Sequence, residues 1–364
     1  MRINDIIGAL NQWAPPSYQE SYDNARLITG NPEQELRGLL VSLDCTEEVV
    51  QEAIAKGANL IVSHHPIVFK GLKTFIGKNY VERTVIKAIK NDIAIFSIHT
   101  NLDNVNTGVN RMICNRLGLI NCKTLAPKTG ILSKIVTFVP SKDTQKVLDA
   151  LYAAGVGHIG NYDECSFQVK GTGTFRPNDQ ANPAIGKHNK SESVDETRIE
   201  GIFPSHLKNK VIAALNKAHP YEEVAYYLTS LENENQEVGS GMVGELASPI
   251  PTESFMRLLK EQFNLKVIRH THFHKTEVKK IAVCGGAGSF LLGHAKGAGA
   301  DVFVTADFKY HEFFDAEEKI IISDIGHYES EVFTKELICN FLKEKFANIA
   351  LNLSEVDTNP IKYF

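Results

Sequence analysis

The sequence of 364 residues has few features of exported or membrane-spanning proteins. It has no run of about 20 apolar residues, so no membrane-spanning helix is expected. Its first residues lack a basic region followed by an apolar one, which argues against a signal peptide. The six cysteines are far apart and form no C-x-x-C pair, which argues against a disulfide framework or a thiolate zinc site. We therefore expect a cytoplasmic protein with buried, reduced cysteines and no membrane partner.

The sequence also lacks an excess of charge of one sign. Lysine and arginine number 39 against 43 aspartate and glutamate, a formal charge of -4. This balance removes the long-range attraction of a nonspecific nucleic-acid binder, although a local basic patch remains open. With 43% hydrophobic residues the chain is expected to be globular rather than disordered. Its length predicts about two domains.

An outer repeat organises the two ends of the chain. The segment from Val41 to His64 aligns with the segment from Val283 to Ala306, 242 residues later. Each copy has an apolar run, an amphipathic helical stretch, a glycine and a second apolar run, which is the pattern of a βαβ unit. Further strand candidates follow at 93–99 and 319–327. The repeat predicts an α/β fold in which two pseudo-repeated βαβ halves form a layered α/β metal-binding domain.

An inner repeat lies between these halves. Residues 138–155 match residues 202–219 at an offset of 64. Two β-α-β copies in tandem predict a ferredoxin-like α+β domain. We expect this insert at 131–236, within a discontinuous domain formed by 1–130 plus 237–364. The stretch 171–198 is rich in Gly, Pro, Asn and Ser, which favours a loop with some hairpin over a binding segment.

Histidines and carboxylates gather at predicted strand ends. In open parallel sheets, ligands bind at the carboxyl ends of the strands. In the first half, S-H-H-P supplies His64 and His65, and I-H-T-N-L-D supplies His99 and Asp103. The second half offers two similar segments, T-A-D-F-K-Y-H-E at 305–312 and D-I-G-H-Y-E-S-E at 324–331. Because the halves are equivalent, we expect these side chains to meet in one place.

Five of these residues form a candidate metal-binding set. A single histidine at a strand end is usually structural. Two histidines before a proline, however, are expected to point to opposite sides of an extended chain, which suits two neighbouring ions. An H-x-x-x-E segment places both residues on one face if a helix begins there. The mixed nitrogen and oxygen set suits Zn²⁺, Mn²⁺, Fe²⁺ or Co²⁺. Its members are His64, His65, Asp103, His327 and Glu331.

Such a site would carry hydrolytic chemistry. Two divalent ions bring four positive charges, and Asp103 and Glu331 return two negative ones. The surplus positive charge should hold hydroxide and attract anionic or carbonyl groups. His99, His311 and Asp44 are candidates for orienting a ligand or for proton transfer, with a purely structural role open for each.

Two other patterns carry less weight. G-G-A-G at 285–288 lies between a predicted strand and a helix, and a tight turn is favoured there over a phosphate cradle because the full G-x-G-x-x-G spacing is missing. H-T-H-F-H at 270–274 would place three histidines on one face of a strand. An exposed or interface edge is favoured there over a ligand set, because no carboxylate accompanies the histidines.

The motifs together resemble the GTP cyclohydrolase 1 type 2 homologue family, the NGG-interacting-factor-three-like dinuclear metal proteins. The resemblance covers nearly the whole chain and looks like the longer bacterial form, whose insert is similar to PII and CutA domains. One departure is T-A-D at 305–307, where the family pattern has T-G-D. The resemblance rests on Y-D-N (22–24), L-I-V-S-H-H-P-I-V-F-K-G-L-K (60–73), H-T-N-L-D-N (99–104), C-G-G-A-G-S-F (284–290), T-A-D-F-K-Y-H-E and D-I-G-H-Y-E-S-E.

The resemblance implies a dinuclear centre and an assembly. The same five residues would bind two ions, with Glu331 bridging, His65 and Asp103 on one ion, and His64 and His327 on the other. It also implies a toroidal homohexamer with the metal sites facing an internal cavity. The family name alone does not establish that this chain opens the ring of GTP.

Two functions from different classes follow. The first is a metal-dependent hydrolase, in which metal-activated hydroxide attacks a nucleotide ring carbon, an amide or a phosphoester. The second is a non-catalytic, metal-loaded regulatory or scaffold ring, which senses a small anionic or nucleotide-like effector through the insert. Binding of single-stranded DNA through a ring is a third reading, which the charge of -4 does not favour.

Overall fold

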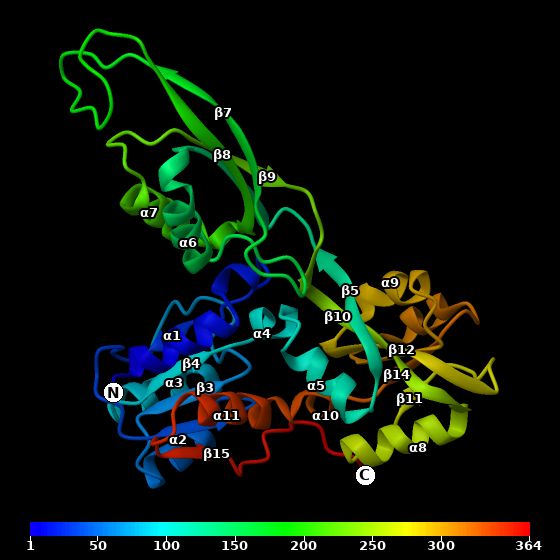
Figure 1. Ribbon diagram of the computed structural model, residues 1–364. Coiled ribbons are helices and arrows are strands. Elements are labelled where there is room, and N and C mark those ends of the chain that lie inside the picture. Colours follow the sequence, from blue (N-terminus) through cyan, green and yellow to red (C-terminus); the bar gives the residue numbers. More distant parts are fainter. The chain divides into compact units, whose positions relative to one another are not determined.

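The computed structural model describes residues 1–364, which divide into two compact units (Figure 1). One unit consists of Met1–Ala126 and Glu237–Phe364, and the other of Pro127–Gln236. No helix is both long enough and apolar enough to cross a membrane. All six cysteines are free thiols. Each unit is described separately below.

The discontinuous unit contains a five-stranded sheet with the order β1-β4-β3-β2-β15. Its strands are β1 (Leu27–Thr29), β2 (Leu39–Ser42), β3 (Leu60–Ser63), β4 (Ala94–Ser97) and β15 (Leu351–Leu353). Neighbours from β15 to β4 are parallel, and β1 is antiparallel at the edge. Every residue of β2, β3 and β4 is buried, which is typical of parallel strands covered on both faces.

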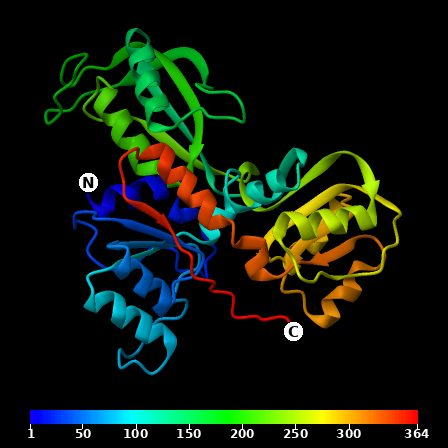
Figure 2. The ribbon, with the colours of Figure 1, turned by 90° about the horizontal axis from the view of Figure 1, so that it is seen from below.

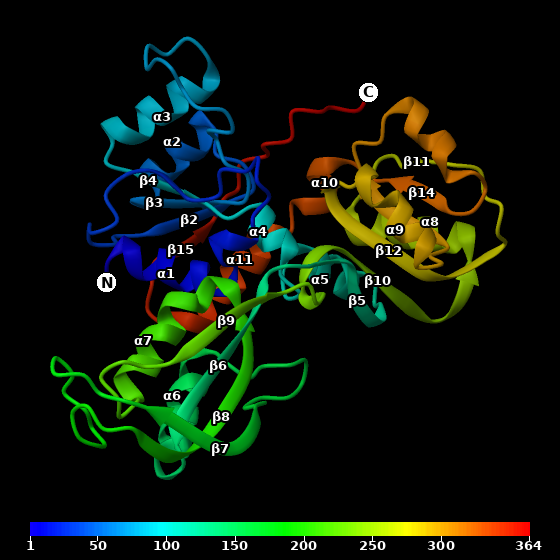
Figure 3. The same ribbon diagram turned by 90° about the horizontal axis from the view of Figure 1, so that it is seen from above.

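Helices cover this sheet on both faces. Figure 3 shows α2 and α3 on one face, with α1 and α11 on the other. On the first face, Val49 and Ala53 of α2 and Val85 of α3 share a buried cluster with Leu40 and Ile61 of the sheet. The helices are α1 (Ile3–Trp13), α2 (Glu47–Ala55), α3 (Tyr80–Lys90) and α11 (Thr334–Lys345), with a short 3-10 helix, η1 (Pro16–Tyr18), after α1.

A six-stranded sheet completes this unit (Figure 2, where β12 to β14 run from yellow to orange). Its order is β11-β14-β13-β12-β10-β5. The strands β12, β13 and β14 are parallel, whereas β10 and β11 are antiparallel to their neighbours. The strands are β5 (Ile120–Lys128), β10 (Asn235–Pro251), β11 (Arg269–His270), β12 (Glu277–Ala287), β13 (Val302–Ala306) and β14 (Ile321–Asp324).

The connections of this half are shorter than those of the first. Between β12 and β13 a 3-10 helix, η4 (Ser289–Leu291), leads into α9 (Leu292–Gly297), and η5 (Tyr310–Ala316) joins β13 to β14. Other helices of this unit are α4 (Thr100–Asn104), α5 (Val109–Arg116), α8 (Thr252–Phe263) and α10 (His327–Glu331). Leu291 and Leu292 pack with Phe303 in a buried cluster that also contains Ile322. Apolar side chains on the connecting helices thus cover one face of the sheet.

The outer repeat corresponds to matched elements of the two halves. At the offset of 242 residues, β2, α2 and β3 fall on β12, η4 with α9, and β13. Thr46 caps α2 by accepting a hydrogen bond from the backbone N–H of Val49 at 3.4 Å. Gly57 and Gly299 follow the two helices with φ of 68° and 70°, a left-handed conformation that favours glycine. A mixed α/β fold with parallel strands is therefore confirmed for both halves.

The other unit has one antiparallel sheet with the order β7-β8-β6-β9. Its elements are β6 (Leu132–Pro140), η2 (Ser141–Asp143), α6 (Thr144–Ala154), β7 (Phe167–Phe175), β8 (Glu192–Pro204), η3 (Ser205–Leu207), α7 (Lys208–Ala218) and β9 (Tyr226–Leu231). The β-α-β-β-α-β order is the one that the inner repeat predicts. Val147 and Leu151 of α6 pack with Val211 and Leu215 of α7 in its core. The likeness to PII and CutA stays a prediction.

The segment 171–198 is a long hairpin. β7 continues to Phe175 and β8 begins at Glu192, so only 176–191 forms the loop. The two strands pair in register from Phe167 with Glu200 to Phe175 with Glu192. The predicted hairpin is therefore present, and its strands are longer than the composition of the segment indicates.

Candidate metal centre

The predicted residues of the first half lie at the ends of two neighbouring parallel strands. His64 and His65 follow β3 directly. His99 follows β4 and precedes α4 (Thr100–Asn104), a short helix that carries Asp103. Because β3 and β4 are parallel neighbours, both ends open at the same edge of the sheet.

The second half supplies its residues from the segment after β14. Gly326 takes a φ of 92° and α10 (His327–Glu331) begins directly after it. His327 and Glu331 are separated by one helical turn, so their side chains share one face. The H-x-x-x-E segment is therefore helical, as its spacing predicts.

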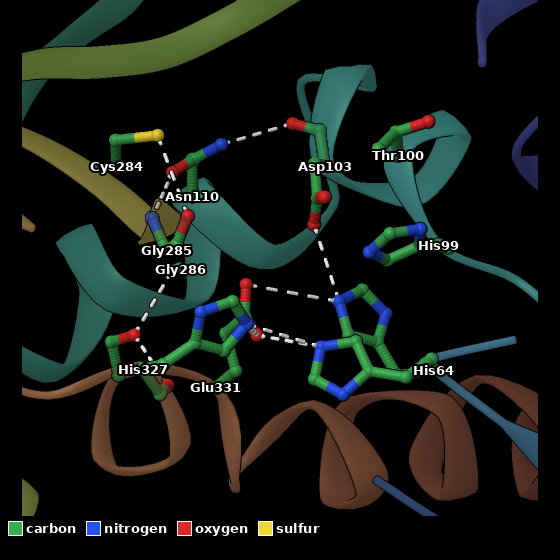
Figure 4. A network of polar contacts seen from close by, with 12 residues as sticks. His64, His99, Thr100, Asp103, Asn110, Cys284, Gly285, Gly286, His327 and Glu331 are labelled. Atoms are coloured by element: carbon green, nitrogen blue, oxygen red, sulfur yellow. Dashed lines mark hydrogen bonds and ion pairs between the residues drawn. The ribbon is translucent and has the colours of Figure 1, made fainter. Parts of the chain in front are cut away.

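Glu331 lies at the centre of the cluster (Figure 4). Its side chain is buried, and each carboxylate oxygen faces different histidines. Oε2 lies 2.9 Å from Nε2 of His65 and 3.1 Å from Nε2 of His327. Oε1 lies 3.9 Å from Nε2 of His64, which is 3.5 Å from Oδ1 of Asp103. All five predicted metal ligands thus meet around one carboxylate.

The cluster contains overlapping groups that could hold a metal ion. Within each group the ligand atoms lie within 4.8 Å of one another, and the groups are His64 with Asp103 and Glu331, His65 with His327 and Glu331, and His64 with His65 and His99. This grouping differs from the implied one, in which Asp103 shares an ion with His65. The imidazoles of His64 and His65 approach two oxygens of the same carboxylate, with ring centroids 5.0 Å apart. The sequence-based expectation that they point to opposite sides of the chain is therefore wrong.

Each histidine of the cluster is held through its other ring nitrogen, Nδ1. The partners are a backbone carbonyl in one case and carboxylates in three, a common arrangement behind metal-binding histidines. It fixes the ring orientation and directs Nε2 into the cluster. The pairs are His64 with Ile98 O at 2.9 Å, His65 with Asp44 Oδ1 at 2.7 Å, His99 with Asp23 Oδ1 at 2.8 Å, and His327 with Asp307 Oδ2 at 2.7 Å.

Two buried atoms of the cluster have no hydrogen-bond partner. They are Nε2 of His64 and Oδ1 of Asp103. Because Nδ1 of His64 donates to the Ile98 carbonyl, a neutral His64 ring turns a lone pair toward Asp103 and Glu331, so acceptors face acceptors. A buried polar atom without a partner costs about 1–3 kcal/mol. A cation between these atoms would satisfy all of them, so the residues fit a metal ion.

The other two histidines that face Glu331, His65 and His327, carry protons. Burial opposes charge on His65, but its hydrogen bonds to Asp44 and Glu331 raise its pKa to about 9. Burial likewise opposes charge on His327, while Asp307 and Glu331 raise its pKa to about 11. Both imidazoles therefore carry a positive charge at neutral pH, and the charge lies beside Glu331.

The remaining members respond to burial and to one another. Burial lowers the pKa of His64 to about 4, so this ring is neutral at pH 7. Burial and the neighbouring Glu331 raise the pKa of Asp103. Burial also opposes charge on Glu331, yet hydrogen bonds from the surrounding histidines, His327 foremost, hold its pKa well below the usual value. The cluster is thus a tightly coupled set of charges.

The glycines at the end of β12 make room for Glu331. A Cβ atom at Gly286 would lie 2.5 Å from Oε1 of Glu331, and this residue has a φ of 62°. The backbone N–H of Gly285 donates to Asn110 Oδ1 at 3.0 Å, and the Asn110 amide donates to the carbonyl of Asp103, also at 3.0 Å (Figure 4). The predicted tight turn is not what this segment forms, because β12 continues to Ala287 with a shift of register between Val283 and Ala287. The contact with Glu331 was not predicted from the sequence.

Other predicted residues lie elsewhere or take a different conformation. His311 is exposed on η5, where its ring contacts Tyr310 and Phe314, and it belongs to none of the metal-binding groups. The strand predicted over 270–274 is wrong, because β11 ends at His270. Asp307 follows β13 in a left-handed conformation with φ 59°, which Asp tolerates better than most residues.

A cavity of about 1270 Å³ opens onto the cluster. Its walls include Asp103, His327 and Glu331, so the candidate centre is reachable from solvent. An aromatic row leads inward along one wall. The Tyr22 and Phe69 ring centroids are 6.3 Å apart, and the Phe69 and His99 centroids are 6.1 Å apart. Lys70, Lys73 and Lys78 also line this cavity.

The charge expected from the ligands alone has to be corrected. Besides Asp103 and Glu331, three carboxylates bond directly to histidines of the cluster, namely Asp23, Asp44 and Asp307. Five ionised carboxylates against two divalent ions leave one net negative charge. The surplus positive charge inferred from the sequence is therefore absent, and attraction of an anion would depend on the cavity lysines.

The fold and site define a mixed α/β protein with a candidate metal centre of histidines and carboxylates between two repeated halves. Residues 1–360 match the family Duf34/NIF3 (NGG1p interacting factor 3). The chain therefore belongs to the Duf34/NIF3 family, and the resemblance seen in the sequence is confirmed.

Relatives of known sequence or structure match the chain over its full length. The GTP cyclohydrolase 1 type 2 homolog of Halalkalibacterium halodurans is 40% identical over 98% of both chains. The protein of the same name from Bacillus subtilis is 37% identical, over 98% of this chain and 97% of the relative. The crystal structure of a Bacillus cereus protein related to NIF3 matches with a TM-score of 0.90 and 38% identity, over 100% of this chain and 99% of the other.

Proposed function

We propose that this protein holds two divalent metal ions and is a metal-dependent hydrolase. The observation that carries the proposal is the set of buried acceptor atoms around Glu331, in which Nε2 of His64 and Oδ1 of Asp103 have no hydrogen-bond partner. His64, Asp103 and Glu331 would hold one ion, and His65, His327 and Glu331 the other. Zn²⁺, Mn²⁺, Fe²⁺ and Co²⁺ all accept such mixed ligands. When bound, two such ions polarise a substrate oxygen and make water a stronger nucleophile near pH 7.

The residues around the ligands would keep the centre in one geometry. Asp44 and Asp307 fix the rings of His65 and His327, and the Ile98 carbonyl fixes His64. His99 faces the cluster without being needed in either three-residue group of the proposed centre. Asp23 holds its Nδ1, so Nε2 of His99 is the ring nitrogen available to exchange a proton with a substrate. We assign proton transfer to this histidine.

The cavity supports a planar, anionic substrate. The aromatic row of Tyr22 and Phe69 suits stacking of a flat ring, and it ends at His99 beside the cluster. Lys70 and Lys73 line the same cavity and suit a phosphate or carboxylate. A small nucleotide-like compound has both features. The relatives named GTP cyclohydrolase 1 type 2 homolog point to the same substrate class.

The test is hydrolysis by the metal-loaded protein. It would be loaded separately with zinc and manganese and given nucleoside triphosphates, phosphoesters and amides of small acids. We expect turnover of at least one nucleotide that disappears on chelation and in His64→Ala. His270→Ala, which alters an exposed histidine of β11, serves as the matched control and should keep full activity. Turnover that survives chelation, or no turnover with any substrate, would remove the hydrolase assignment.

A second experiment separates binding from chemistry. Lys70→Gln with Lys73→Gln should raise KM for the anionic substrate about tenfold and leave kcat unchanged, because these side chains contact the substrate away from the reacting bond. Lys90→Gln, at the end of α3, is the control. An unchanged KM would show that the lysines do not bind the substrate.

Assembly and the second unit belong to the proposal as well. We propose the toroidal homohexamer that the resemblance implies, to be checked by light scattering of the purified protein. The regulatory alternative assigns a small effector to residues 127–236, which form their own core. Calorimetry of the full chain with nucleotides, with and without metal, separates the two. Binding that is unaffected by removing the metal would favour the effector function.

A further inference from the structure

Two of the six cysteines lie together in the discontinuous unit. Cys114 is on α5 and Cys122 is on β5, and their thiols share a hydrogen bond. They are eight residues apart in the sequence. Cys165, by comparison, lies in the other unit, where its thiol points to the carbonyl of Asp163 at 3.8 Å.

The backbone between the two cysteines turns back on itself. Gly118 has a φ of 66°, and the N–H of Leu119 donates to the carbonyl of Cys114 at 3.0 Å. The turn ends α5 and sends β5 back past the last turn of the helix. A Cβ atom at Gly244 of β10 would lie 2.7 Å from Sγ of Cys122. The Cys122 thiol thus occupies space that a glycine leaves over the sheet, and it donates to the carbonyl of Leu119 at 3.4 Å in the turn after α5.

The two thiols differ in access and acidity. Cys114 is fully buried, whereas Cys122 is half-buried. A hydrogen bond from the Cys114 thiol and the charge of Arg111 outweigh burial and lower the pKa of Cys122 to about 7. The same hydrogen bond, with burial, raises the pKa of Cys114. An accessible thiolate beside a protonated thiol is the usual pairing of an attacking and a resolving cysteine.

We propose that Cys114 and Cys122 are an oxidisable dithiol, which a peroxide converts to an intramolecular disulfide. The Cys122 thiolate attacks a peroxide oxygen, the O–O bond breaks, and Cys122 becomes a sulfenic acid while the leaving oxygen is protonated. The sulfur of Cys114 then attacks the sulfenic sulfur, the S–O bond breaks, and water leaves with the Cys114 proton. Two thiols and hydrogen peroxide thus give one disulfide and two waters.

The helix that carries Cys114 also contacts the candidate metal centre. Asn110, one turn earlier on α5, bonds to the backbone of both Asp103 and Gly285. A disulfide at the C-terminal end of α5 restrains this helix, so we expect it to change how fast the ions leave. This second effect rests on the proposed function, whereas the disulfide itself does not.

The experiment uses the full-length, zinc-loaded protein, because zinc is not oxidised by peroxide. After treatment with hydrogen peroxide, free thiols are blocked with N-ethylmaleimide and tryptic peptides are examined by mass spectrometry. We expect peptide 112–116 joined to peptide 117–123, two hydrogens lighter than their sum, and separated by reducing agent. Cys165→Ser should form the same product. Peptides 112–116 and 117–123 recovered singly and blocked would overturn the proposal.

Two variants test the order of the steps. In Cys114→Ser, Cys122 should stop at the sulfenic acid, which dimedone traps, whereas Cys122→Ser should give no trapped product on Cys114. Equal trapping at both sites would contradict the assignment of Cys122 as the attacking thiol. If either variant fails to fold, the wild-type peptide map still decides whether the disulfide forms.

Metal release is the separate readout of the second effect. Transfer of zinc to a chromogenic chelator should differ at least threefold between reduced and oxidised wild-type protein, and not at all between treated and untreated Cys122→Ser. Equal rates in the wild type would overturn the link to the metal centre. Failure of the hydrolase assay would leave both the peptide map and this rate interpretable.

Discussion

The two repeated halves share a scaffold but divide the chemistry between them. Each has three parallel strands joined by helical connections, with matched glycines after the first helix. Position 65 carries His65, a candidate ligand, whereas the equivalent position 307 carries Asp307, which orients a histidine of its own half. Position 44 carries Asp44, which orients His65, whereas the equivalent Gly286 makes room for Glu331.

This difference shows how a repeat can form an asymmetric centre. A duplicated βαβ unit fixes where the strand ends lie, because backbone pairing and core packing depend on pattern more than on identity. The side chains at those ends are free to differ. One half then supplies three imidazoles and a carboxylate, and the other supplies one imidazole and the central Glu331.

Among the substitutions that test this division, Glu331→Gln should have the largest effect on metal binding. The carboxylate faces three histidines from both halves, and the amide keeps its size but loses its charge. We expect affinity for both ions to fall by more than about 100-fold, beyond the ~10–100-fold typical of losing an outer partner. Metal content after dialysis, by plasma mass spectrometry, measures this. Glu329→Gln on the same helix is the control, and two retained ions in Glu331→Gln would contradict the central position of Glu331.

A finer comparison uses the orienting carboxylates, one from each half. Asp44→Asn and Asp307→Asn should each weaken metal binding by about 10–100-fold, because the histidine behind each one loses a charged partner. Asp44 should matter more, since its side chain is 31% exposed against 51% for Asp307. Competition with a fluorescent zinc chelator gives both affinities. A larger loss in Asp307→Asn would reverse the ranking of the halves.

The pH dependence of metal binding reports on one protonated histidine from each half, His65 and His327. In the metal-free protein the pKa is about 9 for His65 and about 11 for His327, so incoming ions displace protons at pH 7. Affinity should therefore rise roughly tenfold per pH unit for each displaced proton. Because both pKa values are raised, their contribution to metal-free stability is complete below about pH 6.5 and is lost as pH rises through 9 and then 11.

Calorimetry in two buffers of different ionisation enthalpy counts the released protons. Wild-type protein should release close to two protons on loading at pH 7.5. Asp44→Asn should release fewer, because His65 loses the first hydrogen bond that keeps it charged. Metal binding that is independent of pH between 6.5 and 8.5 would contradict protonated histidines in the metal-free site.

The last prediction concerns stability and compares glycines of the two halves. Gly286→Ala places a Cβ against Glu331 at a positive φ and should destabilise the fold by about 2–3 kcal/mol. Gly57→Ala and Gly299→Ala have open space around the new atom and positive φ, so about 1 kcal/mol is expected for each. Urea unfolding of the metal-free variants measures the three values. Equal losses at all three positions would show that contact with Glu331 adds nothing.

The sequence predicts the scaffold and the members of the cluster, because both follow from local pattern. Alternating apolar runs, glycines and strand-end motifs select His64, His65, Asp103, His327 and Glu331. The charge state of the site does not follow from pattern. It depends on Asp23, which reaches His99 from a loop 76 residues earlier in the chain. Asp23 does not follow a strand, so the strand-end pattern could not indicate that it contacts the cluster.

The grouping of the ligands could not be predicted from the sequence either. Adjacent His64 and His65 suggest separation across a strand, but β3 ends at Ser63, so neither histidine follows strand geometry. His311, which was proposed as a residue of the site, lies outside the cluster for a related reason. It lies near Asp307 in sequence, yet η5 turns its side chain away toward Tyr310 and Phe314. Residues beyond a strand end are placed by the loop, whose path sequence spacing does not determine.

Because the unit is discontinuous, the residues of the cluster are synthesised at different times. His64, His65 and Asp103 leave the ribosome long before Glu331, which is 228 residues further along than Asp103. At ~5–20 residues per second, this interval lasts about 10–50 s. During that time the nascent chain exposes the candidate metal-binding imidazoles without their central carboxylate, while residues 127–236, which form a compact unit, are being made. The candidate centre is therefore complete only at the end of translation.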